Sequence, residues 1–167
     1  MKIPRFGLSL TFLLVCISAH AQTGIYAAAT GARLGGLYDE TIYGPTIGVY
    51  FDEWHAAVIS LGVDARGQFL KNGSTTLTGG MAGPRVAFTP HVLPLKPYVE
   101  GLVGAGYVEA GGGSSTNVEY TLLGGLDFTF FPHVDWRVVE FSYGGLSFLD
   151  GTLHPKTLSM GLVFRLP

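Results

Sequence analysis

The feature that most constrains this chain is an alternation of side-chain type with a period of two residues. In residues 118–131 (VEYTLLGGLDFTFF), large apolar side chains alternate with small, polar and acidic ones. Alternate residues of a β-strand point to opposite sides of a sheet, so such a strand has one apolar face and one polar face. No segment of useful length shows the 3.6-residue period of an amphipathic helix. The pattern therefore predicts an all-β protein.

Eight segments show this alternation, and glycines punctuate them: about 24–34, 43–51, 56–68, 76–88, 96–108, 116–130, 134–144 and 156–166. Most are close to the about 9–11 residues that a tilted strand needs to cross a bilayer. Short connections rich in Pro or His, such as FPHVD, alternate with longer ones that are mostly polar or rich in Gly. This rhythm is typical of up-and-down barrels of bacterial outer membranes. The longer connections, at about 34–43, 69–76, 108–116 and 145–155, would face outside and carry any binding function.

Composition indicates which face of the strands meets oil. Only 13% of the residues are charged and 47% are hydrophobic, whereas a soluble domain has about 25% charged residues. The polar faces carry Gly, Ser, Thr and few charges, which suits the narrow interior of an eight-stranded barrel. The apolar faces are large and carry aromatics near the strand ends, which suits lipid. In addition, a closed barrel leaves no unpaired backbone group in the oil.

We therefore predict an eight-stranded antiparallel up-and-down transmembrane β-barrel with its apolar side chains outside. The side chains that we expect to face lipid are Ile59, Leu61, Tyr120, Leu122, Leu126, Phe128, Phe130, Leu158, Met160, Leu162 and Phe164. The alternative is a soluble secreted barrel of the lipocalin type, which would have the apolar set inside and bind an apolar ligand. Its weakness is the shortage of charge for a water-facing surface.

The N-terminus, MKIPRFGLSLTFLLVCISAHAQ, has a basic start, an apolar stretch and a small-x-small sequence. This is the pattern of a secretory signal peptide, and we expect cleavage after Ala21, which leaves residues 22–167 as one barrel domain. The alternatives are an N-terminal membrane anchor or a lipoprotein at Cys16, although no small residue stands just before Cys16. Because Cys16 is the only cysteine, the cleaved chain would have no disulfide, thiolate metal site or cysteine nucleophile.

Charged residues on the inward parity predict an ion-pair network in the lumen, because desolvated charges must be paired. By their depth along the strands, the residues expected in this network are Arg85, Glu100, Asp127, Arg137, Glu140 and Arg165. Asp64 and Arg66 would lie higher in the lumen, toward the outer rim. Such a network could be a structural plug that fixes register and blocks flow, or a gate whose pairs exchange to open a narrow pore; we favour the plug.

The strand at 134–144 poses a problem of register. Arg137 and Glu140 have opposite parity, so both point inward only if a β-bulge near Val138 and Val139 shifts the register. Without a bulge, Arg137 would extend to the periplasmic interface instead. We favour the bulge.

Several kinds of chemistry find no support in the sequence. A net charge of −2 gives no electrostatic case for nucleic-acid binding. The histidines lack metal-ligand spacing, so we expect neither a metal nor a cofactor. Some outer-membrane barrels modify lipid A with a His and a Ser on the outer surface. Here Ser142, Ser147 and His154 form no recognisable pair, so we expect no enzyme and keep lipid A modification as a further alternative.

Taken together, the signal sequence, the alternating strands and the amphipathic C-terminal strand resemble the small eight-stranded outer-membrane barrels. These are the transmembrane domain of outer membrane protein A and its relatives. The resemblance covers about residues 22–167 and rests on pattern. It implies a location in the outer membrane of a Gram-negative envelope, a lumen plugged by ion pairs, and a role in envelope integrity, surface interaction or weak porin activity.

The resemblance also implies partners. These are outer-membrane lipids, lipopolysaccharide and the barrel assembly machinery, and we expect a monomer; the sequence names no ligand for the outer loops. Barrels of this kind usually end in Phe or Trp. This chain ends GLVFRLP, in which Phe164 and Leu166 keep the alternation and Pro167 is last. Pro167 departs from the signal that the assembly machinery reads.

Overall fold

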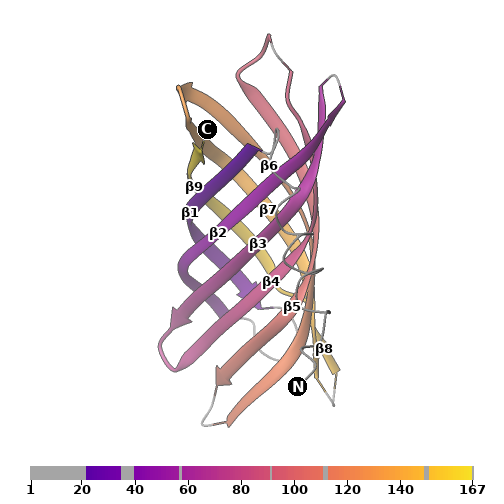
Figure 1. Cartoon of the computed structure of the whole chain (residues 1–167). Coiled ribbons are helices and arrows are strands. Elements are labelled where there is room, and N and C mark those ends of the chain that lie inside the picture. Colours follow the sequence, from indigo (N-terminus) through magenta and orange to yellow (C-terminus); the bar gives the residue numbers. More distant parts are fainter. Residues whose placement is uncertain are drawn as a thin grey trace, which may run out of the picture.

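The computed structural model describes residues 22–34, 40–56, 58–90, 92–110, 113–148 and 151–166. The predicted signal segment with Cys16, and Pro167, lie outside the described residues. The chain forms a barrel of tilted strands (Figure 1). The strands are β1 (Gln22–Leu34), β2 (Glu40–Ala56), β3 (Ile59–Asn72), β4 (Thr75–Phe88), β5 (Leu95–Ala110), β6 (Gly113–Phe131), β7 (Val134–Phe148), β8 (Gly151–Leu153) and β9 (Lys156–Leu166).

Eight long strands pair in a closed antiparallel ring, as the sequence predicts. The order of pairing is β6-β5-β4-β3-β2-β1-β9-β7, and β6 pairs with β7 to close the ring. The ninth strand, β8, is a three-residue piece that pairs with the end of β7. Closure satisfies the backbone groups of every long strand and leaves no open edge. In the part of the chain that the structure describes, no helix is long and apolar enough to cross a membrane.

The two ends of the barrel differ and are named here for their connections. The turn end, uppermost in Figure 1, holds Gln22, Leu166, the strand ends Ala56 and Phe88, and the turn at 132–133. The loop end holds the turn at 73–74, the strand ends Leu34, Ala110 and Phe148, and the short strand β8. Both ends of the described chain therefore lie at the turn end, as an even number of strands requires.

The expectation of long loops at the loop end is wrong for the described segments. Most of 69–76, 108–116 and 145–155 continues as strand, and β3 and β4 are joined by a two-residue turn. In that turn Gly73 has φ = 56°, a left-handed conformation that glycine adopts without steric cost. These hairpin segments are polar in composition, but their backbones continue to pair as β-strands. Of the expected loop at 34–43, residues 34 and 40–43 are strand, and residues 35–39 lie outside the described residues.

The predicted bulge in β7 is present. The register of β7 against β9 shifts between Arg137 and Glu140, and the two side chains are only 0% and 2% exposed. The ladder with the opposite neighbour, β6, shows the same extra residue in β7, because Leu126 pairs with Val139 and Asp127 with Arg137. The bulge therefore turns both Arg137 and Glu140 into the lumen, and the alternative position of Arg137 at the interface is wrong.

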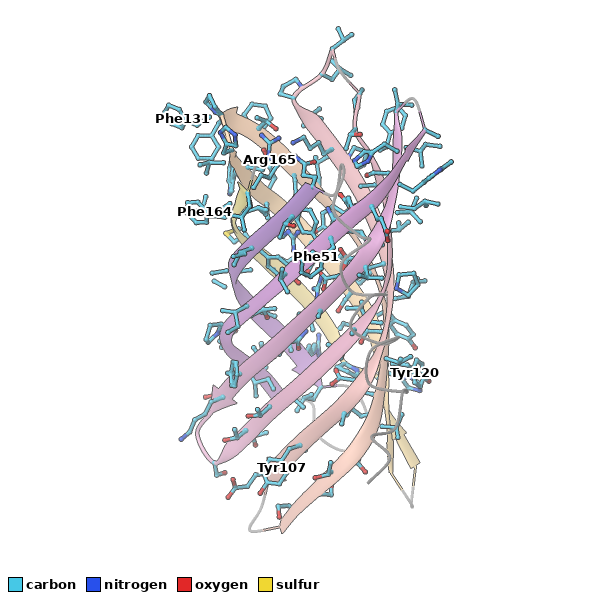
Figure 2. All side chains as sticks on the ribbon, viewed as in Figure 1. Phe51, Tyr107, Tyr120, Phe131, Phe164 and Arg165 are labelled. Atoms are coloured by element: carbon cyan, nitrogen blue, oxygen red, sulfur yellow. The ribbon has the colours of Figure 1, made fainter. Side chains whose placement is uncertain are left out.

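Large apolar side chains cover the outside of the barrel, and each of the eight long strands contributes some of them (Figure 2). Leu122 is 68% exposed, Val103 65% and Leu158 55%. Of the residues that we expected to face lipid, all but Leu126 and Phe128 are exposed on this surface, and those two, which lie beside the β7 bulge, are partly covered. Most exposed Phe and both Trp lie outside toward the turn end, and the exposed Tyr lie toward the loop end; Phe69 near the loop end and Phe141 midway along β7 are exceptions. The turn-end set is Phe51, Trp54, Phe88, Phe130, Phe131, Trp136 and Phe164, and the loop-end set is Tyr43, Tyr107, Tyr120 and Tyr143.

The lumen is filled in layers. Charged groups occupy the half nearer the turn end, and hydroxyl groups follow them, with Thr30 Oγ1 lying 2.7 Å from Thr46 Oγ1 and 2.9 Å from Ser159 Oγ. At the loop end an apolar cluster, called here the apolar cap, closes the interior. It consists of Ala32, Leu34, Ile42, Leu70, Leu77, Val108 and Leu146.

Candidate functional site in the lumen

The charged half of the lumen is the densest group of functional side chains in the described structure. Three arginines meet five carboxylates there, and six strands contribute. This charged layer consists of Arg66, Arg85, Arg137, Asp52, Asp64, Glu100, Asp127 and Glu140, together with Tyr26, Tyr50 and Tyr98. All eleven side chains are buried, because they lie on the inward parity of strands in a narrow ring.

Arg66 on β3 joins carboxylates from three strands. Its Nε lies 3.0 Å from Asp64 Oδ1, its Nη1 donates to Glu140 Oε1 at 2.7 Å, and its Nη2 donates to Glu100 Oε2. One planar guanidinium thus ties β3, β5 and β7 together across the lumen. Multiple charge-assisted bonds of this kind are the geometry that arginine provides and lysine does not.

Arg137 on β7 forms a fork with its neighbour on β6. Its Nε donates to Asp127 Oδ1 at 3.0 Å and its Nη2 to Asp127 Oδ2 at 3.4 Å, while Nη1 donates to Glu140 Oε2 at 3.0 Å. Arg85 on β4 donates to Glu100 Oε1 through Nη1 and lies 3.6 Å from Asp127 Oδ2. The same carboxylates are therefore shared between arginines, and the layer is one network.

Tyrosine rings separate the arginines and extend the network. The guanidinium carbon of Arg85 lies 4.0 Å from the ring centre of Tyr98 and 4.3 Å from that of Tyr50, and the guanidinium carbon of Arg137 lies 4.1 Å from the centre of Tyr26. Desolvated cation–π contacts of this kind are worth about 2 kcal/mol. Two of the hydroxyls also donate to carboxylates, that of Tyr26 to Asp64 at 2.9 Å and that of Tyr98 to Glu140 at 2.7 Å.

Glycines opposite the tyrosines make room for these rings. Tyr26 pairs with Gly48 and Tyr98 pairs with Gly125, each in direct cross-strand register. A Cβ at Gly48 would lie 2.4 Å from the Tyr26 ring, and one at Gly125 would lie 2.3 Å from the Tyr98 ring. Tyr50 lies over Gly24 in the same way. The Tyr–Gly pairs therefore fix where each ring lies, and hence which arginine it covers.

A smaller cluster lies at the turn end. Asp135 Oδ2 lies 2.9 Å from Lys96 Nζ and 3.0 Å from Arg165 Nε, and Thr129 Oγ1 donates to Asp135 Oδ1 at 2.6 Å. The contact of Arg165 is close but is not aligned as a hydrogen bond. Lys96 and Arg165 keep 18% and 17% of their side chains exposed, so this cluster is the mouth of the lumen.

The structure brings together five of the six residues that the sequence singled out: Arg85, Glu100, Asp127, Arg137 and Glu140. Two placements need correction. Arg165 pairs with Asp135 at the mouth, apart from the other five. Arg66 does not belong to a separate upper lumen, because it binds Glu100 and Glu140 directly. Height in a barrel depends on strand tilt as well as on residue count, and the count alone placed Asp64 and Arg66 too high.

Sequence reasoning missed part of the site. Tyr26, Tyr98, Asp52, Asp135 and Lys96 share the inward parity with the residues that were identified. The period-two alternation could have identified the tyrosines, because it assigns a Tyr that alternates with Ala or Val to one face of its strand. Asp52 and Asp135 lie at strand ends, where the bulges obscure parity.

The described outer surface holds no Ser–His pair of the kind that lipid A-modifying barrels use. Ser142 is buried in the lumen with its Oγ 2.5 Å from Thr157 Oγ1, whereas His154 is exposed and stacks on Tyr143 at 5.7 Å between ring centres. The side chain of Ser147 lies outside the described residues. Among the described side chains, no three His, Cys, Asp or Glu residues are placed to hold a metal ion.

No protein-family model matches the chain, and no curated protein matches its sequence. Solved structures do match its fold. Neisserial surface protein A is 19% identical, with 89% of this chain and 100% of that chain covered and a TM-score of 0.63. Ail, the attachment invasion locus protein of Yersinia pestis, was solved with the heparin analogue sucrose octasulfate. It is 15% identical, with 89% of this chain and 100% of that chain covered and a TM-score of 0.56. The outer membrane enzyme PagL is 18% identical, with 85% of this chain and 99% of that chain covered and a TM-score of 0.54.

These similarities concern the fold, because the identities are low. The chain has the architecture of the small eight-stranded outer-membrane β-barrels, as its sequence pattern indicates. PagL has this architecture and is an enzyme, so the fold alone does not decide whether the chain has an activity.

Proposed function

We propose that the chain is an integral outer-membrane barrel that serves the cell envelope as a structural or surface-interacting protein and has no enzymatic activity. The observation that carries this proposal is the inverted distribution of side chains. Arg137, Glu100 and Asp127 are at most 1% exposed, whereas large apolar side chains on every long strand are exposed. In water this arrangement would be unstable, and in a bilayer it is the expected one.

The lumen in this proposal is a plug. Arg66, Arg85 and Arg137 each contact at least two carboxylates from different strands, so a passage would open only if several ion pairs broke together. Beyond the charged layer, the apolar cap would still exclude water. Two barriers in series favour a closed structural barrel over a gated pore.

The outward-facing part of the protein would be the loop end. Its strands continue past the tyrosines of the outer surface, for example to Ala110 in β5 and from Gly113 in β6. Strand ends that stand clear of the membrane present a surface to the outside. Neisserial surface protein A and the attachment protein Ail are named for surface roles, and this favours a similar role here. Export by the signal at residues 1–21 and insertion by the barrel assembly machinery belong to the same proposal.

The experiment that tests this function is electrophoretic. The full chain is expressed in a Gram-negative host, the membranes are fractionated, and the protein is run on SDS gels with and without boiling. We expect a faster unboiled band that is confined to the outer-membrane fraction, with residue 22 at its N-terminus. A single unshifted band in the soluble periplasm would contradict the proposal and favour the soluble barrel with an apolar ligand.

A further inference from the structure

The lumen toward the turn end holds one carboxylate more than it holds cations. Among the described side chains, the charged layer and the mouth together contain six carboxylates and five cations. The carboxylates are Asp52, Asp64, Glu100, Asp127, Asp135 and Glu140, and the cations are Arg66, Arg85, Lys96, Arg137 and Arg165. An unmatched charge is strongly destabilising in a dry interior, so one more cation is needed there.

Asp52 is the carboxylate that lacks a close partner. It is 2% exposed, and its Oδ1 accepts no hydrogen bond from the described groups. Arg85 Nε lies 3.7 Å away and is itself unbonded, because the other arms of Arg85 lie toward Glu100 and Asp127. Ser60 Oγ lies 3.5 Å from Asp52 Oδ2, which is a weak contact. Each of the other five carboxylates accepts a hydrogen bond from an arginine or a lysine.

Strand register places the start of β1 beside Asp52. Gln22, the first residue of β1, is directly opposite Asp52 on β2. Direct neighbours on antiparallel strands have Cα atoms about 4.5–5.5 Å apart, so rotation of the Asp52 side chain can bring a carboxylate oxygen to the backbone nitrogen of Gln22. The Oδ1 atom now lies toward β3, against Gly62, where a Cβ would approach it to 2.6 Å.

Removal of the signal would create a charge at this point. The expected cleavage hydrolyses the peptide bond between Ala21 and Gln22. Ala21 gains the hydroxyl of water and leaves with the signal as a carboxylate, and the nitrogen of Gln22 gains the hydrogen. The resulting α-amine takes up a proton and is mostly an ammonium group at pH 7. In the structure this bond is intact, so the nitrogen of Gln22 belongs to a neutral amide.

We propose that Asp52 is the binding site for the α-ammonium group of Gln22 that removal of residues 1–21 creates. The contact is a charge-assisted bond, and it gives this half of the lumen equal numbers of carboxylates and cations. It also ties the start of β1 to β2 at the mouth. The inference rests on the export step of the proposed function, and it identifies the ligand of the one carboxylate that the folded chain leaves unpaired.

The test uses full chains that are expressed in a Gram-negative host, purified from the outer membrane and checked for their N-terminus by mass spectrometry. Asp52→Asn removes the carboxylate and keeps its shape. Glu53→Gln is the matched control, because it neutralises the adjacent residue, which is exposed. A third variant carries one extra Gln after Ala21, which moves the α-ammonium group about 3.4 Å along the strand. A fourth combines this insertion with Asp52→Asn.

The first readout is the rate at which an amine reagent labels the α-amine of the folded barrel at pH 7, located by peptide mass mapping. We expect labelling of the unchanged chain and of Glu53→Gln to be roughly tenfold slower than labelling of Asp52→Asn or of the insertion variant, since a bond to a charged group protects the amine. Equal rates in all four would overturn the inference. A Gln22 that has lost ammonia and cyclised to an uncharged lactam would also overturn it.

The second readout is the temperature at which half of the unboiled band converts to the boiled form. We expect Asp52→Asn and the insertion each to lower it, and the combined variant to be no lower than Asp52→Asn alone, because both changes break the same bond. An insertion without effect, or effects that add, would mean that Asp52 serves Arg85 alone and would overturn the inference. The insertion keeps every side chain, so it decides the question even if Asp52→Asn does not assemble.

Failure of the inference and failure of the proposed function are distinguishable. A heat-modifiable outer-membrane barrel that begins at Gln22 and shows no coupling to Asp52 would contradict the inference alone. The same holds for a barrel that is cleaved at another residue. A chain that never reaches the outer membrane would contradict both.

Discussion

The charged layer and the apolar cap lie in the same narrow lumen, within a few residues of each other along most strands. In the charged layer, Arg137 is 0% exposed and bonded to two carboxylates from neighbouring positions on β6 and β7. In the apolar cap, Leu70 and Ile42 are equally buried and lie in a cluster of apolar side chains. Both regions exclude water, but the charged layer does so with directional bonds and the cap with apolar packing that requires volume and no particular bond.

The difference shows what each region requires of the sequence. Buried ion pairs are stabilising only when every partner is in place, because an uncompensated charge costs several kcal/mol. The charged layer therefore depends on strand register, on the β7 bulge and on the Tyr–Gly pairs. An apolar cluster needs only the right total volume and tolerates exchange among aliphatic side chains. The charged layer can specify one register among many, and the cap cannot.

The largest effect is expected from Arg137→Ala. The change would leave Asp127 and Glu140 with unmatched charge in a dry interior, and breaking a buried ion pair of this kind costs about 4 kcal/mol. The free energy of unfolding would be measured by urea titration in lipid vesicles, with Trp54 and Trp136 as fluorescent probes. Arg137→Lys should lose less, because it keeps the charge. A loss below about 1 kcal/mol for Arg137→Ala would show that the layer is not a cooperative network.

A somewhat smaller effect is expected from Leu70→Ala in the apolar cap. Leu70 is fully buried, and removing its methyl groups leaves a cavity, which costs about 3 kcal/mol. Leu70→Met keeps the volume and should cost less than about 1.5 kcal/mol in the same titration. If the two variants were equally destabilised, the cap would depend on specific shape, and its contrast with the charged layer would weaken.

Gly125→Ala should cost about 1–3 kcal/mol by overpacking. The new Cβ would lie 2.3 Å from the Tyr98 ring, so the ring must move away from Glu140 and Arg85. Gly124→Ala is the matched control, because its Cβ would meet nothing closer than 3.7 Å. Equal stability of the two variants would mean that the ring has room to move, and that the Tyr–Gly pairs do not hold the layer.

The smallest effect is expected from Glu119→Gln. Glu119 is 3% exposed, packs against Gly79 and Gly106, and its Oε2 has no hydrogen-bond partner among the described groups. Since no ion pair is lost and an amide is cheaper to bury than a carboxylate, stability at neutral pH should change by less than about 1 kcal/mol or rise slightly.

Glu140→Gln provides the comparison for Glu119. It removes a charge that Arg66 and Arg137 both contact, and it should be clearly destabilising in the same titration. If Glu119→Gln were as harmful as Glu140→Gln, an ionic partner of Glu119 would have to exist in the apolar half of the lumen.

The sequence predicted most of the fold because period-two alternation reports directly on strand faces. It located the eight long strands, the outward position of Leu122 and Met160, and the bulge that brings Arg137 and Glu140 inward. The alternation also identified most of the inward charges. A charged residue on the same strand face as the small residues must point into the lumen.

The remaining features depend on quantities that alternation does not encode. The partners of Arg66 and Arg165 depend on the tilt and stagger of the ring, which set which residues share a level. The apolar cap has the parity of the polar face, so Leu34, Leu70 and Leu146 contradict the simple division into an oily outside and a polar inside. The hairpin extensions were read as loops, because polar residues mark exposure to water and not the end of hydrogen bonding.

The most direct test of the central claim, that the apolar faces of the strands meet lipid, is a spin-label scan of β9. Residues 22–167 contain no cysteine, so single cysteines can be introduced at Leu158, Ser159, Met160, Leu162 and Val163 and labelled in the reconstituted barrel. Accessibility to oxygen, which dissolves in lipid, is then compared with accessibility to a water-soluble reagent. The account predicts high oxygen accessibility at 158, 160 and 162 and little accessibility to either reagent at 159 and 163. Labels at 158, 160 and 162 that are shielded from oxygen, with 159 open to the water-soluble reagent, would contradict it and place the oil inside.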